Sequence, residues 1–443
     1  MSTYSTSDGS VAATTAGGVD SKLMRRVVLG GAVGSFVEWY EFAVYGFLAA
    51  TLAKAFFPAV GGGNGVLASL AVFGVAFFAR PVGGFLWGYV GDRIGRRQTL
   101  AITVLSMSLC TTLVGVLPSA ATIGVAAPIL LVALRILQGV AAGGEISGAV
   151  SFIAEHSDAG RRGWRVATVE AGAVSGNLVG ALVTSIMILS LPAASLTSWG
   201  WRIPFLIAIV MGLVGVYIRR RLEETPYFRE LEERGDRAGN PLYEALTGRA
   251  QWVLLARSFG VVALNAASFF LIVGYLPTFA NSILKLSGWA AVTPPVIALI
   301  VTLAAVYLGG WLSDLSRRKT LLLSAGGLAV LSYPCFLLIT SGHYGLIVLG
   351  LVIFGVPTGV YCSATQVALT DMFPTKVRVS GHGVAYNISV AIFGGIAPYL
   401  ITSLNHATGD RLVAAYFVAA VAVLSFLVSL TVTETAGKPL RRD

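Results

Sequence analysis

The chain has 443 residues, of which 56% are hydrophobic and 12% are charged, and its mean hydropathy is +0.79. Polar residues are too few to cover a water-soluble globule of this length, so the composition excludes a soluble fold and indicates a membrane protein. The formal net charge of +10 also occurs in nucleic-acid-binding proteins, but here the basic residues cluster between apolar segments, so no nucleic acid is expected as a partner.

Apolar runs of about twenty residues follow one another along the chain, and each can cross roughly 30 Å of hydrocarbon as a helix. We predict an all-α membrane protein with twelve transmembrane helices, at 26–50, 66–90, 98–118, 124–153, 165–190, 201–219, 252–280, 290–313, 320–340, 344–370, 380–404 and 411–433. The 52 glycines suit such helices, because small residues let membrane helices pack closely.

The basic residues lie almost entirely on one side of the predicted membrane. With twelve spans, the two tails and the even-numbered breaks share a side and hold 24 of the 31 lysines and arginines, whereas the other side holds four. The positive-inside rule then predicts that both termini are cytoplasmic.

The longest polar interruption, from Arg219 to Arg249, follows the sixth predicted span. This interruption separates two predicted six-helix bundles. The segment before the first bundle is rich in Ser, Thr, Gly and Ala, a composition typical of disordered tails. The predicted parts are a disordered cytoplasmic tail at 1–24, an N-terminal bundle at 25–218, a cytoplasmic central loop at 219–250, a C-terminal bundle at 251–434 and a cytoplasmic tail at 435–443. The first apolar segment is longer than a signal-peptide core and contains acids, so we expect it to remain as a span.

An internal repeat supports this division. The string GYVGDRIGRR begins at Gly88 after the second span, and GWLSDLSRRK begins at Gly310 after the eighth. A second echo relates AEHSDAGRRG, after the fourth span, to TDMFPTKVRVSG, after the tenth. Duplicated six-helix halves are typical of secondary transporters that rock around a central site.

The first copy of the repeat has a physical interpretation of its own. Its glycines permit close packing, its aspartate can accept N–H groups at a neighbouring helix N-terminus, and its arginines can pair with acids on adjacent helices. We therefore expect a cytoplasmic gate made of Gly88, Asp92, Arg93, Arg96, Arg97, Asp314 and Arg318. A basic anchor that only sets the topology is the alternative, and a phosphate-binding loop is excluded because its lysine and its strand-to-helix context are missing.

These strings also resemble a known family. GYVGDRIGRRQTL resembles the loop signature of the major facilitator superfamily, and RILQGVAAGGE is similar to its fourth-helix motif. With GSFVEWYEFAVYGF, FFARPVGG, SWGWRIPF, LEETPYF and YNISVAIFGG they resemble the metabolite:proton symporter branch, which carries citrate, 2-oxoglutarate, shikimate, proline and betaine. The resemblance implies two pseudo-symmetric six-helix bundles and proton-coupled transport by alternating access. Two departures are Leu315 and Arg317 in the second loop copy, and Glu41 where the family usually has aspartate.

Seven charged residues lie within the predicted spans: Glu38, Glu41, Arg80, Arg135, Glu145, Glu170 and Arg257. A charge at the bilayer centre costs roughly 2.5–3.5 kcal/mol, so such residues usually face a partner or a watery cavity. Arg257, near the start of its span, is expected to reach the cytoplasmic interface instead. We assign proton coupling to Glu38, Glu41, Arg135 and Glu145. The resemblance implies that Arg135 acts in coupling or substrate binding, and a fixed ion pair that joins two helices is the alternative.

Glu38 and Glu41 are three positions apart on one helix, so their simultaneous ionisation is unfavourable. We expect an arginine such as Arg80 or Arg135 to hold one of them, while the other gains and loses the proton. The sequence leaves open which of the two has which role.

The predicted substrate site combines polar residues of both halves: Arg80, Tyr45, Glu170, Asn177, Asn265, Tyr275, Gln366 and Asn387. Gly172, Gly176 and Gly180 line the helix face opposite Glu170 and Asn177 and are expected to pack on a neighbouring helix. Pro277, Pro357 and Pro398 are expected to break their helices beside the site. Helix packing for Arg80 and interhelical hydrogen bonds for the amides and tyrosines are the alternatives.

Three intramembrane arginines favour a carboxylate-bearing substrate, such as citrate, 2-oxoglutarate or a shikimate-like acid, and the zwitterions proline and betaine are the alternative. The four histidines form no metal set, so no cofactor is expected and protons are the coupling ion. An enzyme or receptor would need a metal cluster, a nucleophile constellation or an extramembrane domain, and the sequence contains none. We expect a monomeric, non-enzymatic transporter in the bacterial inner membrane.

Overall fold

The computed structural model describes residues 21–94, 96–220, 248–374 and 377–441, and within them the chain is helical without strands. The long helices of the first half are α1 (Ser21–Phe47), α3 (Gly62–Ile94), α4 (Arg96–Val116), α6 (Ala126–Ala142), α7 (Glu145–Glu155), α8 (Arg162–Ser190) and α10 (Arg202–Arg220). Those of the second half are α13 (Arg249–Phe270), α15 (Trp289–Leu315), α16 (Arg317–Thr340), α17 (Tyr344–Met372), α18 (Arg378–Val390), α19 (Ala397–Thr408) and α20 (Val413–Ser429). Short helices α2 (Ala49–Phe56), α5 (Ala120–Ile123) and α9 (Ala193–Ser195) lie in the connections.

Eleven segments of the described chain are long and apolar enough to cross a membrane, and α20 is a shorter apolar helix. Together they coincide with the twelve predicted spans, which confirms the fold class. The boundaries differ by a few residues: the first span, predicted to end at 50, ends at Phe47, and α2 follows it almost directly. The chain is therefore a multi-pass helical membrane protein.

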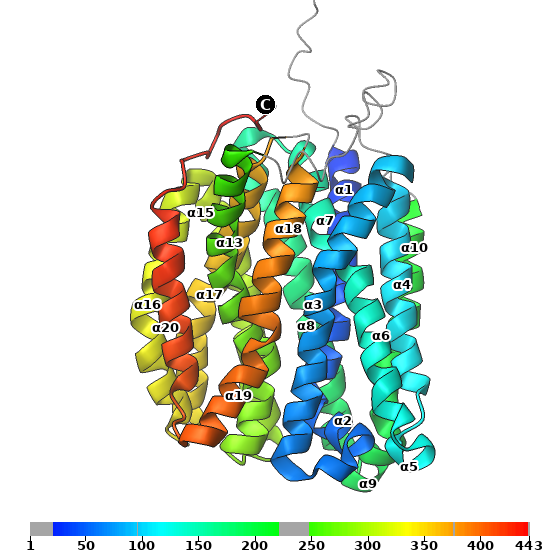
Figure 1. Ribbon diagram of the computed structural model, residues 1–443. Coiled ribbons are helices and arrows are strands. Elements are labelled where there is room, and N and C mark those ends of the chain that lie inside the picture. The colour runs from blue at the N-terminus through cyan, green and yellow to red at the C-terminus, as the bar shows by residue number, and fades with distance from the viewer. Residues whose placement is uncertain (1–20, 95, 221–247, 375–376, 442–443) are drawn as a thin grey trace, which may run out of the picture.

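Successive spans run in opposite directions, and α1 to α10 form one half of the molecule while α13 to α20 form the other (Figure 1). Helix α1 begins and α20 ends at the same end of the bundle, which we call the terminal face. The other end carries α2, α5 and α9 and is called the opposite face (Figure 1). Between the halves, α8 packs on α15 and α17, α3 packs on α18, and α1 packs on the turn that follows α13.

Two spans of the second half are interrupted next to this boundary. Helix α13 passes into the π-helical turn η4 (Leu271–Tyr275), then α14 (Leu276–Thr278), which contains Pro277, and a second π turn, η5 (Phe279–Ile283). Helix α18 passes into the π turn η7 (Ala391–Gly395) just before Pro398. The predicted breaks at Pro277 and Pro398 are confirmed, whereas that at Pro357 is wrong, because α17 accommodates this proline without interruption.

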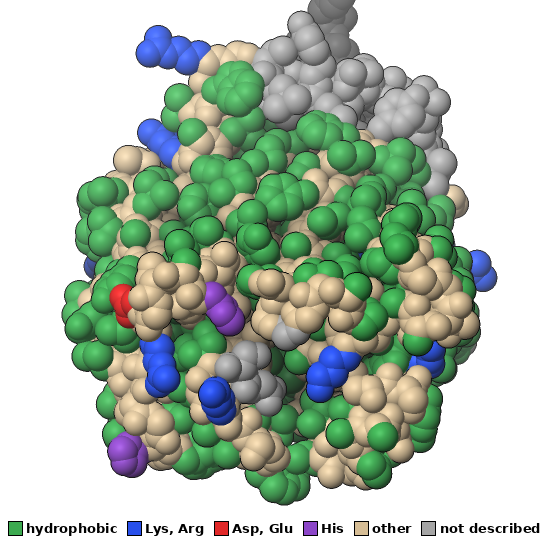
Figure 2. Space-filling view, turned by 60° about the horizontal axis from the view of Figure 1, so that its bottom comes forward, with side chains coloured by type: hydrophobic (Ala, Val, Ile, Leu, Met, Phe, Trp, Pro, Cys, Tyr) green, Lys and Arg blue, Asp and Glu red, His purple; other side chains and the backbone are tan. Residues whose placement is uncertain are grey.

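The outer surface of the bundle is apolar. Figure 2, which looks toward the opposite face, shows hydrophobic side chains over most of the surface in view and few charged groups. Leu323, Val330 and Ile129 are 77%, 73% and 62% exposed. Apolar groups exposed to this extent around a bundle are stable against lipid rather than water.

Candidate functional site

Helix α1 carries two acids into the centre of the molecule. Glu38 is fully buried, and its Oε1 lies 2.6 Å from Nη1 of Arg80 on α3. Arg80 Nε donates a hydrogen bond of 3.1 Å to Asn387 Oδ1 on α18, and Asn387 Nδ2 donates to the Gly143 carbonyl at 2.7 Å. The pairing of Arg80 with Glu38 therefore continues across the boundary between the two halves.

Glu41 has a different environment, although it lies one turn further along the same helix. Gln138 Nε2 on α6 donates to Glu41 Oε2 at 3.0 Å and contacts Thr111 Oγ1 at 2.7 Å. Glu41 Oε1 makes no hydrogen bond of normal geometry with a described residue. Arg135 reaches Glu41 only through the amide, since its Nη1 donates to Gln138 Oε1 at 2.6 Å. Among the described residues, Glu38 is thus the acid with a bound arginine, and Glu41 is held by a neutral side chain.

Arg135 is buried against aromatic faces instead of a carboxylate. Its guanidinium lies 4.3 Å from the ring centre of Tyr45 and 5.2 Å from that of Phe42, and Nη2 donates to the Phe73 carbonyl at 3.3 Å. The Tyr45 hydroxyl donates to the Ser69 carbonyl at 3.2 Å. Cation–π contacts of this kind stabilise a desolvated arginine without neutralising it.

An aromatic cluster, which the sequence analysis did not assign to the site, crosses the boundary between the halves beside these charges. Its members are Trp39, Phe42, Phe73, Phe77, Phe269 and Phe270. Phe270 of α13 lies 4.7 Å from the ring centre of Phe77 and 5.5 Å from that of Trp39. The available signal was the helical spacing of Trp39 with Phe42 and of Phe73 with Phe77, but the same spacing is typical of ordinary packing.

Some of the remaining predicted substrate residues lie at the boundary, and others make their hydrogen bonds within their own half. Gln366 Nε2 on α17 donates to Glu170 Oε2 on α8 at 3.0 Å, so this pair also joins the halves. Asn177 donates to the Ala173 carbonyl of its own helix at 3.0 Å, while Tyr275 accepts from Asn405 at 2.7 Å within the second half. Asn265 is buried, and its Nδ2 has no partner among the described residues.

The predicted glycine face of α8 is confirmed and explains how Glu170 is aimed. A side chain at Gly172 or Gly176 would overlap the backbone of Ala32 or Phe36 on α1, so only glycine allows this approach. With that face occupied by α1, Glu170 points toward α17.

Glu145, predicted beside Arg135, is instead paired with Arg219 at the end of α10. Both terminal nitrogens of the Arg219 guanidinium, Nη1 and Nη2, contact the Glu145 carboxylate, the first at 2.8 Å, and Thr103 Oγ1 donates to it at 3.1 Å. Arg219 also donates to the carbonyls of Leu100 and Gly30. The central loop was predicted to begin at Arg219, but this residue belongs to α10 and its side chain is buried.

At the terminal face, two ion pairs join the halves in a reciprocal arrangement. Arg162 of α8 lies 2.6 Å from Asp371 of α17, and Arg378 of α18 lies 3.0 Å from Glu155 of α7. Each acid precedes the arginine of its own half by seven positions and pairs with the arginine of the other half. The sequence analysis did not assign these four residues, although they lie in the two strings that form its second echo.

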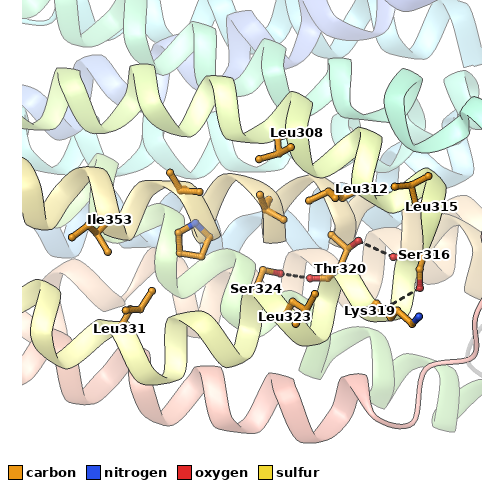
Figure 3. Close-up of a pocket in the computed structure, with 13 residues that line it drawn as sticks. Leu308, Leu312, Leu315, Ser316, Lys319, Thr320, Leu323, Ser324, Leu331 and Ile353 are labelled. Atoms are coloured by element: carbon orange, nitrogen blue, oxygen red, sulfur yellow. Dashed lines mark hydrogen bonds between the residues drawn. The ribbon is translucent and has the colours of Figure 1, made fainter.

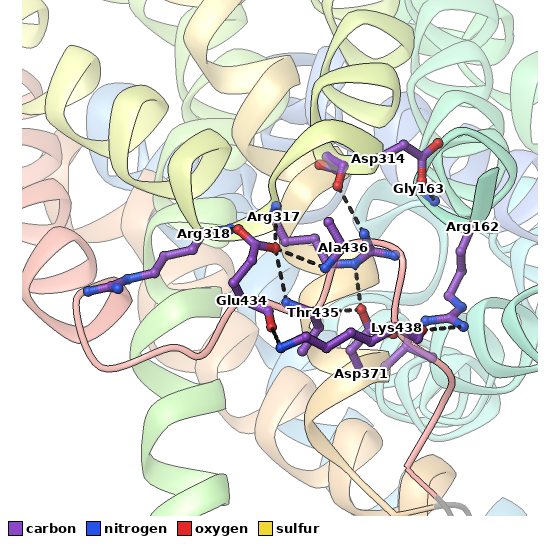
Figure 4. Close-up of polar contacts among 12 residues, drawn as sticks. Arg162, Gly163, Asp314, Arg317, Arg318, Asp371, Glu434, Thr435, Ala436 and Lys438 are labelled. Atoms are coloured by element: carbon purple, nitrogen blue, oxygen red, sulfur yellow. Dashed lines mark hydrogen bonds and ion pairs between the residues drawn. The ribbon is translucent and has the colours of Figure 1, made fainter. Parts of the chain in front are cut away.

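The predicted gate residues differ in whether their contacts join the two halves. Asp314 accepts the backbone N–H groups of Gly163 at 2.6 Å and Trp164 at 2.9 Å, in the first turn of α8, so it bridges the halves (Figure 4). Arg97 contacts the Arg220 carbonyl and Arg318 donates to the Leu430 carbonyl at 2.7 Å, each within its own half. The structure does not describe the surroundings of Gly88 or the side chains of Asp92, Arg93 and Arg96. Most of the central loop and residues 1–20 also lie outside the described residues.

The segment after α20 lies over these pairs (Figure 4). Thr435 Oγ1 donates to Asp371 Oδ2 at 2.8 Å, and Arg162 Nη2 donates to the Lys438 carbonyl at 3.2 Å. Glu434 accepts the N–H groups of Arg317 at 3.0 Å and Arg318 at 3.3 Å, and so caps α16. Partial burial raises the pKa of Glu434, but hydrogen bonds from Ser316 Oγ and the backbone outweigh it and bring the pKa below its ordinary value.

Comparison with known proteins agrees with this architecture. The model of the Major Facilitator Superfamily matches residues 31–398 and 296–441. The solved structure of the proton:xylose symporter XylE bound to 6-bromo-6-deoxy-D-glucose aligns with a TM-score of 0.78 at 18% identity, over 95% of this chain and 98% of that one. The inward open conformation of XylE from E. coli gives 0.71 at 17% identity, over 94% and 98%.

Curated relatives align over most of their length. A proline/betaine transporter of Escherichia coli (strain K12) is 35% identical over 432 residues, which are 96% of this chain and 86% of that protein. The glycine betaine/proline/ectoine/pipecolic acid transporter OusA of Dickeya dadantii is 34% identical over 431 residues, with the same coverage. The ectoine/proline transporter ProP of Corynebacterium glutamicum is 33% identical over 436 residues, 95% of this chain and 86% of that one. The chain therefore belongs to the major facilitator superfamily, in the branch that includes these proline and betaine transporters.

Proposed function

We propose that the protein is a secondary transporter that takes up a zwitterionic osmolyte of the proline or betaine type together with a proton, by alternating access. The relatives named above carry proline, betaine or ectoine by their names, and they support this substrate class. The di- or tricarboxylate favoured by the sequence has no support among them. We further propose that the terminal face is cytoplasmic and that the protein acts as a monomer in a bacterial cell membrane.

The charges and rings at the boundary suit a zwitterion. A carboxylate needs a cationic partner, which Arg80 and Arg135 supply, and a substituted ammonium is attracted by aromatic faces such as those around Phe270. Among the described residues, the buried polar atoms Asn265 Nδ2, Gln366 Oε1 and Asn177 Oδ1 have no hydrogen-bond partner. They lie on α13, α17 and α8, and α17 packs on both of the other helices. Buried polar groups are nearly always satisfied, so a ligand that supplies their hydrogen bonds would be held there.

The proton is assigned to Glu41, and the observation that carries this proposal is the contrast between the two glutamates. Glu38 is balanced by Arg80 at 2.6 Å, whereas Glu41 accepts a hydrogen bond from the neutral Gln138 and has no ion pair with a described residue. A buried charge without a counter-ion is costly, so Glu41 can exist in protonated form without disrupting an ion pair. When Glu41 loses its proton, the negative charge of its carboxylate would be balanced by Arg135, which lies on the other side of the Gln138 amide.

Coupling to the membrane potential follows from the charge count. A zwitterion with one proton carries one positive charge, and an inside-negative potential of 100 mV contributes roughly 2.3 kcal/mol to its uptake, about fiftyfold in accumulation. A monoanion with one proton would be electrically neutral and would gain nothing from the potential. Dependence on potential therefore distinguishes the proposed substrate from an organic acid.

The experiment is uptake into proteoliposomes that contain the purified full-length chain. Labelled glycine betaine, proline and citrate are compared with an imposed pH gradient, with a potassium diffusion potential, and with neither. We expect betaine or proline to accumulate with either driving force, and citrate to remain at equilibrium. Accumulation of citrate alone, or osmolyte uptake that ignores both gradients, would refute the proposal.

A further inference from the structure

A groove of about 670 Å³ opens on the outer surface of the second half, away from the boundary between the halves. It is lined by residues of α15, α16 and α17, including Leu308, Leu323, Ser324, Leu331 and Ile353 (Figure 3). Leu323 on its rim is 77% exposed, while Ser324 and Val360 on its floor are buried. The groove therefore faces the surroundings of the bundle.

The packing of α16 explains the groove. Toward the opposite face, a Cβ added at Gly350 of α17 would lie 2.7 Å from the Cys335 carbonyl of α16, so the helices touch there. Nearer the terminal face, a Cβ added at Gly327 of α16 would have Pro357 Cβ, at 3.9 Å, as its nearest neighbour. Helices α16 and α17 thus separate toward the terminal face, and the groove is the space between them.

The wall of the groove contains hydroxyl groups, but these have hydrogen-bond partners within their own helix. Thr320 Oγ1 donates to the Ser316 carbonyl at 2.7 Å, and Ser324 Oγ donates to the Thr320 carbonyl at 2.5 Å (Figure 3). Both donors are satisfied by their own helix, so a hydrocarbon chain can lie against them without leaving a polar group unpaired. From Lys319 to Leu331 the groove follows twelve residues of α16, about 18 Å at the helical rise and close to the depth of one leaflet of a bilayer.

Of the described residues that line the groove, one is basic, Lys319, at the end nearest the terminal face. Three basic residues begin α16, but Arg317 is buried against Asp371 at 2.5 Å and Arg318 donates to the Leu430 carbonyl. Lys319 is exposed, and its ammonium has no acidic partner in the described part of the chain. The nearby carboxylate of Glu434 is occupied by Ser316 and by the backbone at the start of α16.

We propose that this groove, defined by α15, α16 and α17, binds an anionic glycerophospholipid. One acyl chain would lie against the apolar lining residues, such as Leu308, Leu331 and Ile353, and the headgroup phosphate would lie at Lys319. The depth of the groove, its apolar wall and the placement of one unpaired lysine at its headgroup end fit a lipid better than a polar solute. The site is separate from the proposed transport pathway and does not depend on the identity of the substrate.

Native mass spectrometry of the delipidated full-length protein tests the proposal with two lipids that share acyl chains, dioleoylphosphatidylglycerol and dioleoylphosphatidylcholine. We expect the anionic phosphatidylglycerol to be retained preferentially over phosphatidylcholine. Lys319→Gln should weaken the binding of phosphatidylglycerol about fivefold, the factor for one lysine near an anionic surface. Lys54→Gln, at an exposed lysine of α2, is the matched control and should bind like the unmodified chain. Ser324→Phe, which fills the groove, should weaken both lipids.

A second measurement needs no variant and so does not depend on folding of the variants. A phosphatidylglycerol with a photoreactive acyl chain is added in nanodiscs, and the labelled peptides are identified. We expect labelling of 308–331 and 353–360 to exceed that of the exposed apolar face of α4, which carries Leu105, Leu109 and Leu113. Equal labelling of the two faces, equal retention of the two lipids, retention unchanged in Lys319→Gln, or cross-links that join two copies of the chain across the groove would each overturn the proposal.

Discussion

Arg162 Nη1 lies 2.6 Å from Asp371 Oδ1 across the boundary between the two halves, and Arg317 Nε lies 2.5 Å from the other oxygen of the same aspartate. One buried carboxylate therefore balances two buried arginines from different halves. Together with Glu155–Arg378 and the contact of Asp314 with the start of α8, it joins the two halves at the terminal face. Any motion that opens this face must break these contacts together.

Asp371→Asn is expected to favour opening of the terminal face. The substitution leaves Arg162 and Arg317 buried without a carboxylate, and removal of one partner of a buried pair typically costs about 3–5 kcal/mol. Double electron–electron resonance between spin labels at the exposed positions Arg161 and Lys319, one in each half, should show a shift toward longer distances.

The matched control for this change is Asp158→Asn. Asp158 pairs with Arg165 at 2.9 Å, but its side chain is 58% exposed, so the pair contributes little. The distance distribution should stay as in the unmodified chain. If Asp371→Asn gives the same distribution as this control, the pairs do not hold the terminal face closed.

Glu41→Gln is expected to uncouple transport from the proton while leaving substrate binding in place. Glutamine preserves the shape of the side chain but cannot release a proton, so accumulation of betaine should fall from about fiftyfold at 100 mV to equilibration, while counterflow exchange continues. Glu38→Gln should behave differently, because it leaves Arg80 without its anion, and both uptake and exchange should be lost. Concentrative uptake that survives in Glu41→Gln would assign the proton elsewhere.

Acid is expected to release the segment after α20. The pKa of Glu434 in the folded protein lies below the ordinary 4.5, so ionised Glu434 stabilises the folded tail above that value, and the contribution is lost as the pH falls through the lowered pKa. A spin label at Pro439 should be immobilised at neutral pH and become mobile only at a pH below 4.5, the ordinary value for the carboxyl group. Glu434→Gln should be mobile at every pH, and an immobile label in that variant would show that the cap does not hold the tail.

The helices, the two halves and the pairing of one α1 glutamate with an arginine could be predicted from local pattern, because hydropathy and intramembrane charges indicate them without knowledge of packing. That Glu38 rather than Glu41 is the paired acid is seen only in the structure. The reciprocal pairs could not be predicted from position alone. Glu155 and Arg378 are more than 200 residues apart, and both look like ordinary interface charges until the repeat is aligned. Glu145 illustrates the opposite error: its helical position next to Arg135 indicated a shared site, but Arg219, at the end of a distant span, is its partner.

The aromatic cluster was missed for a related reason. A phenylalanine in a membrane helix is expected whether it packs against lipid, protein or substrate, so the identity of the residue carries almost no signal. Its role depends on the contact between Phe77 of one half and Phe270 of the other, which only the folded chain reveals.

Phe270→Leu is expected to impair recognition of betaine more than that of proline. Leucine keeps the apolar volume but removes the ring that meets Trp39, Phe73 and Phe77. A quaternary ammonium donates no hydrogen bonds and depends on aromatic faces, worth roughly 0.5–2 kcal/mol each, so the KM for betaine should rise about 2- to 30-fold. The secondary ammonium of proline can still donate to buried oxygens such as Gln366 Oε1 and should lose less. Phe205→Leu removes a ring of α10 that packs on Trp201, just before that helix, so it provides the control and should leave both KM values unchanged. Equal increases for the two substrates in Phe270→Leu would mean that the ring maintains packing between the halves rather than contact with the ammonium.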